Sequence, residues 1–187
     1  VKKLAIERGL PIAQPERLRS EEFLKILKEW NADLGVVVAF RMLPEVVWSM
    51  PEMGTVNLHG SLLPQFRGAA PIQRAIMAGA TESGATTFLL TEDIDMGDML
   101  GQVVLPIGPN ENAGSLHDRI LKGGKNLLAK TVDDLADGVA KAIPQSNVVS
   151  ELNINLLDAH KLFKEDRRIS WLRSAEDLHN HIRGLSP

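Results

Sequence analysis

Blocks of apolar and polar residues along this chain alternate between the spacing of helices and that of strands. Residues 19–33 contain the N-cap residue Ser20, and the large apolar residues that follow it fall on one broad face of a helix. This pattern predicts an amphipathic helix. Apolar spacing and cap residues, Ser115, Ser174 and Gly184 among them, predict further helices at residues 1–9, 44–50, 70–79, 115–138 and 174–184.

Apolar runs between these helices predict strands. The run LGVVVAF at residues 34–40 is apolar throughout, which is typical of a strand buried on both faces of a parallel sheet. Further strands are predicted at residues 10–15, 54–59, 84–93 and 98–107, the last two pairing with each other. Because helices and strands alternate with short connections, the sequence predicts an α/β fold with a mainly parallel sheet and helices on both faces.

The chain changes character after residue 144. Residues 145–187 are more polar and more charged, and they predict a linker followed by the beginning of a C-terminal domain. Residues 1–144 are predicted to form the main domain. The chain starts at Val1 rather than at Met, so we expect an N-terminal part of that domain to precede it.

Composition narrows the possible functions. The chain has no cysteine, which excludes disulfides, thiolate metal sites and a cysteine nucleophile. A net charge of −3 argues against a general nucleic-acid-binding surface, although a local basic patch is compatible with it. The absence of cysteine fits the cytoplasmic protein that we expect. No apolar run approaches the ~18 residues of a membrane span, so no transmembrane helix is predicted.

Three polar residues stand at alternate positions where the strand at 54–59 ends. Asn57, His59 and Ser61 would project to the same side of extended backbone. Ligands of parallel sheets bind beyond the carboxyl ends of the strands. An amide donor, a proton carrier and a hydroxyl suit a reaction in which a carbonyl oxygen becomes negative while an amine loses a proton. The alternative is a structural histidine.

Acidic residues gather after the strand at 84–93. Glu92, Asp93, Asp95 and Asp98 surround Gly97. They are compatible with an acidic turn, with a calcium site that lacks the EF-hand spacing, or with a carboxylate that orients His59. The chain contains no P-loop, no GxGxxG, no HExxH and no GxSxG motif, so a phosphate loop, a metal centre and a serine hydrolase are not favoured.

Taken together, these motifs resemble the folate-dependent formyltransferases, and within them the branch that acts on tRNA. The family pattern is Asn-x-His, then S-L-L-P, an Arg-Gly turn and D-x-G-D-x-L. This chain carries it in NLHGSLLPQFRGAAPIQRAI and DIDMGDML, with Asp95 36 positions after His59, as in the family.

The resemblance implies a Rossmann-like fold and formyl transfer from 10-formyl-tetrahydrofolate, without a metal, to the α-amine of methionine on initiator tRNA. It implies catalytic roles for Asn57, His59 and Asp95. It also implies folate contacts from Ser61, Leu62, Leu63 and Pro64, and a pterin pocket that includes Phe40, Arg41, Met42, Leu43, Thr91 and Asp93.

The remaining expectations concern partners and alternatives. We expect a monomer that binds initiator tRNA and folate but no membrane, with a β-barrel-like domain after Pro187. Arg41 stands where the tRNA branch usually has glycine and is closer to the purine branch. The alternatives are formyl transfer to a small amine, hydrolysis of formyl-folate by water, and a folate-binding regulatory domain without turnover.

Overall fold

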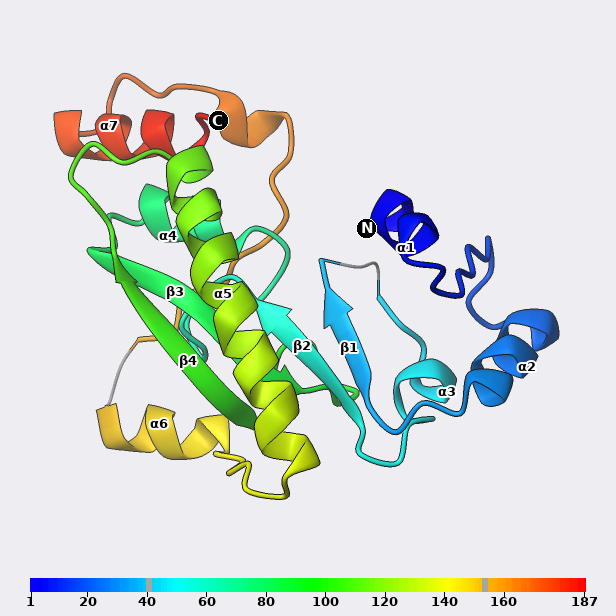
Figure 1. Ribbon diagram of the computed structural model, residues 1–187. Helices are drawn as coiled ribbons and strands as arrows, with labels where there is room; N and C mark the ends of the chain where they lie inside the picture. The colour runs from blue at the N-terminus through cyan, green and yellow to red at the C-terminus, as the bar shows by residue number, and fades with distance from the viewer. Residues whose placement is uncertain (40–41, 153–154) are drawn as a thin grey trace. The chain divides into compact units, whose positions relative to one another are not determined.

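The computed structural model describes residues 1–39, 42–152 and 155–187 (Figure 1). Contacts divide the chain into two compact units. The smaller comprises Val1–Val36 and Phe40–Thr55, and the larger comprises Val37–Ala39 and Val56–Pro187.

The smaller unit consists mainly of short helices. They are α1 (Lys2–Glu7), α2 (Glu21–Trp30) and α3 (Glu45–Trp48), and strand β1 (Gly35–Val38) begins in this unit. The predicted cap of α2 is present, because the Ser20 hydroxyl oxygen accepts a hydrogen bond from the Phe23 N–H at 3.4 Å. Residues 10–15 form no strand, so that prediction is wrong. Pro11 and Pro15 both lack the N–H that a strand ladder requires.

The larger unit holds the elements that position the candidate site. They are β2 (Thr55–His59), α4 (Pro71–Met77), β3 (Glu82–Leu89), β4 (Met99–Pro106), α5 (Ala113–Ala136), α6 (Gln145–Leu152), the 3₁₀ turn Glu165–Arg167 and α7 (Ala175–Gly184). The strands follow the order β1-β2-β3-β4, to which β1 contributes Val37 and Val38 within this unit.

Strand direction departs from the predicted mainly parallel arrangement. Strand β2 pairs with β3, and β3 with β4, in antiparallel registers that place Asn57 opposite Phe88 and His59 opposite Thr86. Helix α4 has only seven residues and spans about 10 Å, too little to carry the chain back along the sheet after β2. The chain therefore re-enters the sheet near the end at which β2 left it.

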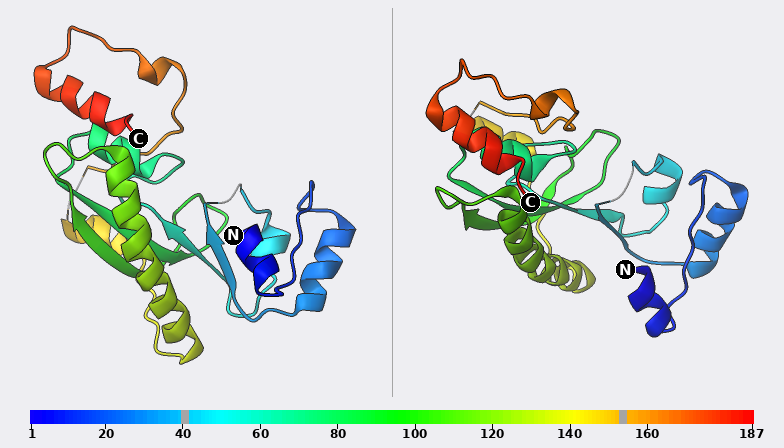
Figure 2. Two further views of the ribbon diagram at one scale, coloured as in Figure 1. Left: turned by 45° about the horizontal axis from the view of Figure 1, so that its top comes forward. Right: turned by 90° about the horizontal axis from the view of Figure 1, so that it is seen from above.

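Helices cover both faces of this sheet, as predicted, and the α/β class is confirmed. On one face, Leu116 and Ile120 of α5 pack against Ala85 of β3. On the other face, Val148 of α6 packs against Phe88 and Met99. Figure 2 shows α5 and α6 on opposite sides of the sheet. Successive residues of β3 thus alternate between two cores.

Two local predictions need correction. Val36 and Val38 of β1 are 47% and 48% exposed, so this strand is not buried on both faces. β-Branched residues fit the pleated, half-buried surface of a strand, so an apolar run of them does not require burial on both faces. Helix α5 begins two residues before the predicted cap, because the Asn112 side chain accepts from the Ser115 N–H at 2.9 Å.

The C-terminal residues pack within the larger unit. Ser174 caps α7 as predicted, and α7 lies against α4 (Figure 1). Residues 145–152 form helix α6 where a linker was predicted. The boundary near residue 144 with a C-terminal domain stays a prediction about the longer protein. Among the described residues, no helix combines the length and the apolar character that crossing a membrane requires.

Candidate functional site

His59 and Asp95, 36 positions apart in the chain, meet at the end of strand β2. The His59 Nδ1 atom lies 3.7 Å from the Asp95 Oδ2 atom, and the two side chains are only 8% and 13% exposed. The His59 ring also stands edge-on to Phe88, with the ring centroids 6.5 Å apart. The structure thus brings together a mostly buried imidazole and a mostly buried carboxylate.

The second ring nitrogen of His59 is hydrogen-bonded to the backbone. Its Nε2 atom lies 2.9 Å from the Phe66 carbonyl oxygen. A carbonyl oxygen only accepts hydrogen bonds, so Nε2 carries the proton and donates it. The Nδ1 edge, which faces Asp95, is therefore the part of the ring available for proton transfer.

Asn57 shares a face of β2 with His59. Leu58, between them, packs on the side of α5, since a Cβ on Gly124 of that helix would lie 3.1 Å from the Leu58 Cδ2 atom. Asn57 and His59 therefore face the opposite side of the sheet. Within the described residues, the half-buried Asn57 side chain makes no hydrogen bond, so its amide is free to bind a ligand.

The loop after β2 is held by a distant segment. The Phe66 N–H donates to the Leu157 carbonyl at 2.7 Å, and the Ala159 N–H donates to the Arg67 carbonyl at 2.6 Å. The Gln65 side-chain oxygen accepts a hydrogen bond from the Leu157 N–H at 2.8 Å, and its Nε2 atom donates to the Asn155 carbonyl. This pairing fixes Phe66, which has a φ of 59°, and thereby the carbonyl that orients His59.

The carboxylate of Asp95 is positioned by the same loop. The Gly68 N–H donates to the Asp95 Oδ2 atom at 2.8 Å. Gly68 has a φ of 121°, and a Cβ there would lie 2.6 Å from the Ala159 carbonyl oxygen, so glycine is required. Asp95 itself has a φ of 54°, uncommon for a residue with a side chain. Backbone geometry on both sides of this contact is therefore closely constrained.

Gln145, at the start of α6, ties the two loops together. Its Oε1 atom accepts from the Arg67 Nε atom at 3.0 Å and from the Nη2 atom at 2.6 Å. Its Nε2 atom donates to the carbonyls of Asp95 at 2.9 Å and Gly97 at 2.8 Å. Gln145 is 3% exposed. Nothing in the pattern AIPQ distinguishes Gln145 from a linker residue, so the sequence alone did not point to it.

The predicted folate-contacting stretch forms a buried loop. Ser61 is completely buried, and its hydroxyl donates to the Gln65 carbonyl at 2.6 Å. Leu63 is 2% exposed, and its N–H donates to the Thr86 hydroxyl at 3.1 Å. Leu62 is half-buried and Pro64 is buried. Folate contacts by these residues stay a prediction.

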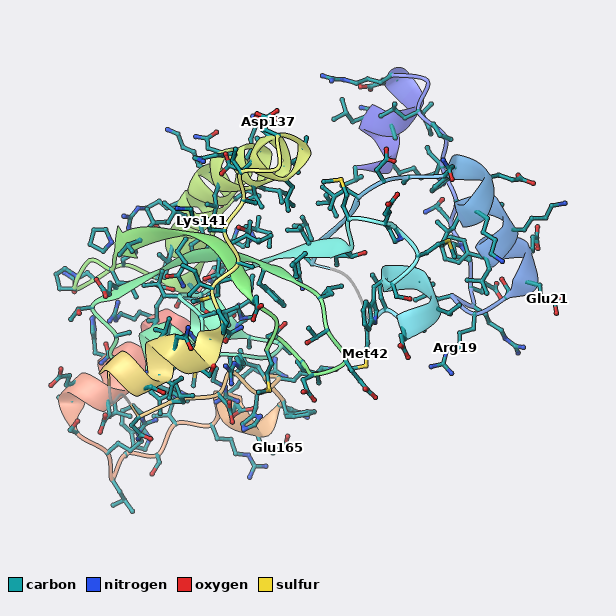
Figure 3. The ribbon with its side chains drawn as sticks, turned by 90° about the horizontal axis from the view of Figure 1, so that it is seen from below. Arg19, Glu21, Met42, Asp137, Lys141 and Glu165 are labelled. Atoms are coloured by element: carbon teal, nitrogen blue, oxygen red, sulfur yellow. The ribbon has the colours of Figure 1, made fainter. Side chains whose placement is uncertain are left out.

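The predicted pterin-pocket residues are distributed over both units. Thr91 and Asp93 are exposed in the larger unit, where the Thr91 hydroxyl donates to the Asp93 carbonyl at 3.3 Å. Met42, labelled in Figure 3, is 75% exposed and belongs with the half-buried Leu43 to the smaller unit. Phe40 and Arg41 lie outside the described residues. In the described part of the chain, no three His, Asp or Glu side chains are grouped so as to hold a metal ion.

Comparison with protein families identifies a match over most of the chain. The formyl transferase family profile matches residues 1–132, which include Asn57, His59 and Asp95.

Curated relatives match the chain from end to end. Methionyl-tRNA formyltransferase from Bacteroides fragilis is 50% identical over 189 aligned residues, covering 100% of this chain and 57% of the relative. The enzyme of the same name from Porphyromonas gingivalis is also 50% identical, with the same two coverages. The chain thus spans little more than half the length of these relatives.

Solved structures share the fold at low sequence identity. A sugar N-formyltransferase from a Shewanella species superposes with a TM-score of 0.77 at 21% identity, covering 98% of this chain and 70% of that one. HypX from Aquifex aeolicus, solved in complex with tetrahydrofolic acid, has a TM-score of 0.69 at 20% identity, covering 86% of this chain and 27% of that one.

Proposed function

Because the chain belongs to the formyl transferase family, we propose that the protein transfers a formyl group from 10-formyl-tetrahydrofolate to the α-amine of methionine on initiator tRNA. The observation that carries this proposal is the 50% identity, over the entire chain, to methionyl-tRNA formyltransferases. The contact between His59 and Asp95, with Asn57 on the same face of β2 as His59, supports the chemistry.

The reaction joins the amine nitrogen to the formyl carbon and breaks the bond from that carbon to the folate nitrogen. As the neutral amine attacks, the formyl oxygen becomes negative. The free amide of Asn57 donates a hydrogen bond to this oxygen, a contribution of about 3 kcal/mol for one well-placed donor. Since His59 Nε2 is bonded to Phe66, the Nδ1 edge is the part of the imidazole that acts on the reacting groups.

Asp95 completes the proton path. The amine loses one proton and the departing folate nitrogen gains one, so the site needs a group that carries a proton between them. The Asp95 carboxylate, 3.7 Å from His59 Nδ1 and anchored by the Gly68 N–H, accepts the proton of the attacking amine, and this proton then passes to the departing folate nitrogen. A positioned acid–base group of this kind contributes roughly 10²–10⁴ in rate.

The proposal extends to binding partners and setting. The donor contacts the 61–64 loop together with the segments around Leu43 and Asp93, and no metal takes part. The protein acts as a monomer in the cytoplasm, and residues 145–187 lead from the catalytic domain to a C-terminal domain. The net charge supports a tRNA-binding surface that this chain shares with the C-terminal domain. The 21 basic and 24 acidic residues leave no overall excess of positive charge on this chain to bind tRNA alone.

The test is to supply the full-length protein with 10-formyl-tetrahydrofolate and each acceptor in turn. We expect formyl-methionyl-tRNA, identified by mass spectrometry of the released aminoacyl group, and no turnover with amino sugars or water alone. Formylation of an amino sugar would instead favour a small-amine formyltransferase. Release of formate without an acceptor would favour a hydrolase, and donor binding without any turnover would favour a regulatory domain.

A further inference from the structure

We infer that Gln145 is a positioning residue for Asp95, and that its side-chain amide sets the geometry of the catalytic carboxylate. The inference rests on the proposed formyl transfer. Gln145 lies 50 positions from Asp95 and 78 from Arg67, yet it bonds directly to both.

All four hydrogen-bonding positions of the Gln145 amide are used. Its oxygen receives two donors from the Arg67 guanidinium, and its two N–H groups reach the carbonyls of Asp95 and Gly97. Arginine only donates and carbonyls only accept, so the orientation of the amide is unambiguous. No other side chain of similar size provides two acceptor positions and two donors at these places.

The bonds to Asp95 and Gly97 act on a constrained turn. Asp95 has a left-handed φ of 54°, and a Cβ on Gly97 would lie 1.7 Å from the Leu89 carbonyl oxygen. The turn therefore has little freedom on the Gly97 side. Gln145 holds the Asp95 carbonyl, while the Gly68 N–H holds the Asp95 carboxylate.

The bond to Arg67 connects these two restraints. Arg67 directly precedes Gly68, so the amide that fixes the Asp95 backbone also fixes the residue beside the donor to its carboxylate. Among the described residues, Arg67 has no carboxylate partner, and the neutral Gln145 oxygen orients it without cancelling its charge. Loss of the amide would therefore remove a restraint on the Asp95 backbone and, at the same time, a restraint on the Arg67 side chain beside the donor to its carboxylate.

The experiment is a double-mutant cycle in the full-length protein. Gln145→Met is made in the wild-type and in the Asp95→Asn backgrounds, and the rate of formyl transfer is measured over a range of donor concentrations up to saturation. In the wild-type background we expect the rate to fall at least about tenfold, with the KM for the donor nearly unchanged, because the amide acts on transition-state geometry. In the Asp95→Asn background we expect less than about a twofold further loss, because coupled residues are not additive.

Gln145→Glu separates the two halves of the contact. It retains an acceptor for Arg67 but loses both donors to the Asp95 turn, so we expect a rate loss similar to that of Gln145→Met. A wild-type rate for this variant would show that only the Arg67 contact matters and would overturn the inference.

Thr131→Val provides the matched control for general destabilisation. Thr131 is buried in α5 and bonds to the Thr87 hydroxyl at 2.8 Å, on the face of the sheet opposite His59. We expect this variant to lose thermal stability but to retain the wild-type transfer rate. Equal rate losses for Thr131→Val and Gln145→Met would show a merely structural role.

The outcomes also separate this inference from the proposed function. If the wild type formylates another amine, the proposed acceptor is wrong, and the same cycle, run with that amine, still tests Gln145. If the wild type formylates methionyl-tRNA but Gln145→Met costs the same factor in both backgrounds, the inference about Gln145 fails alone.

Discussion

Replacing Gly68 with alanine tests whether the Gly68–Asp95 contact determines the geometry of the site. Gly68 has a φ of 121°, and an added Cβ would lie 2.6 Å from the carbonyl oxygen and 3.0 Å from the carbonyl carbon of Ala159. Ala159 cannot move away freely, because its N–H bonds to the Arg67 carbonyl and its carbonyl accepts from Ala70. The Gly68 backbone must therefore shift, and its N–H with it.

The expected loss in the free energy of unfolding combines three effects. Strained backbone costs about 1–3 kcal/mol, overpacking against Ala159 about 1–3 kcal/mol, and the lost hydrogen bond to a charged carboxylate about 1.5–3 kcal/mol. These contributions overlap, so we expect Gly68→Ala to lower the free energy of unfolding by about 3–6 kcal/mol, a large part of the stability of a typical domain. The transfer rate should also fall, because the Asp95 carboxylate loses its anchor.

Gly138→Ala is the matched control. Gly138 also has a positive φ, 68°, but a Cβ there meets nothing within 4 Å, so only the backbone strain of about 1–2 kcal/mol applies. Urea denaturation measures both variants, and the formylation assay measures their rates. If Gly68→Ala were no less stable than Gly138→Ala and transferred formyl groups at the wild-type rate, the Gly68 contact would not control the site.

Three further predictions concern His59, Asn57 and Glu111. His59→Ala should remove most turnover while donor binding, followed by titration calorimetry, changes only a few-fold; a near-normal single-turnover rate would contradict this role. Asn57→Ala should lower kcat by about 10²-fold, or about 3 kcal/mol, and an effect confined to KM would show ground-state binding only. Burial raises the pKa of Glu111, but bonds from Arg119 and the Gly108 N–H outweigh it and hold that pKa below its usual value. The stabilisation by the Glu111 carboxylate is therefore present above its unfolded-state pKa and lost as pH falls through the lower folded-state pKa. Glu111→Gln should cost about 1–3 kcal/mol at neutral pH, and a loss in urea denaturation that does not shrink in acid would contradict this account.

Local signals in the sequence predicted the elements that depend on local chemistry. The caps Ser20 and Ser174 marked the starts of α2 and α7, because a serine hydroxyl bonds within its own first turn. Strand direction was not predictable in the same way. The antiparallel pairing of β3 depends on where α4 returns the chain, which residue patterns do not encode.

The candidate site likewise contains residues that the sequence identified and others that only the folded structure reveals. The family resemblance drew attention to Asn57, His59 and Asp95, and the structure places His59 beside Asp95. The supports of this pair lie outside any local pattern. The Phe66 carbonyl and the Gln145 amide act through contacts that only the folded chain creates.

The long-range pairing of the loop after β2 has a consequence for the order in which the protein is made. Phe66 and Arg67 gain their main-chain partners only when Leu157 and Ala159 are present, about 90 residues later in the chain. Synthesis proceeds from the N-terminus, and contacts between distant residues form late because a long loop must close first. His59 and Asp95 therefore leave the ribosome well before the segment that fixes them. The nascent protein therefore has strand β2 before the candidate site is ordered, and under the proposed function we expect formyl transfer only after residue 159 has emerged and paired.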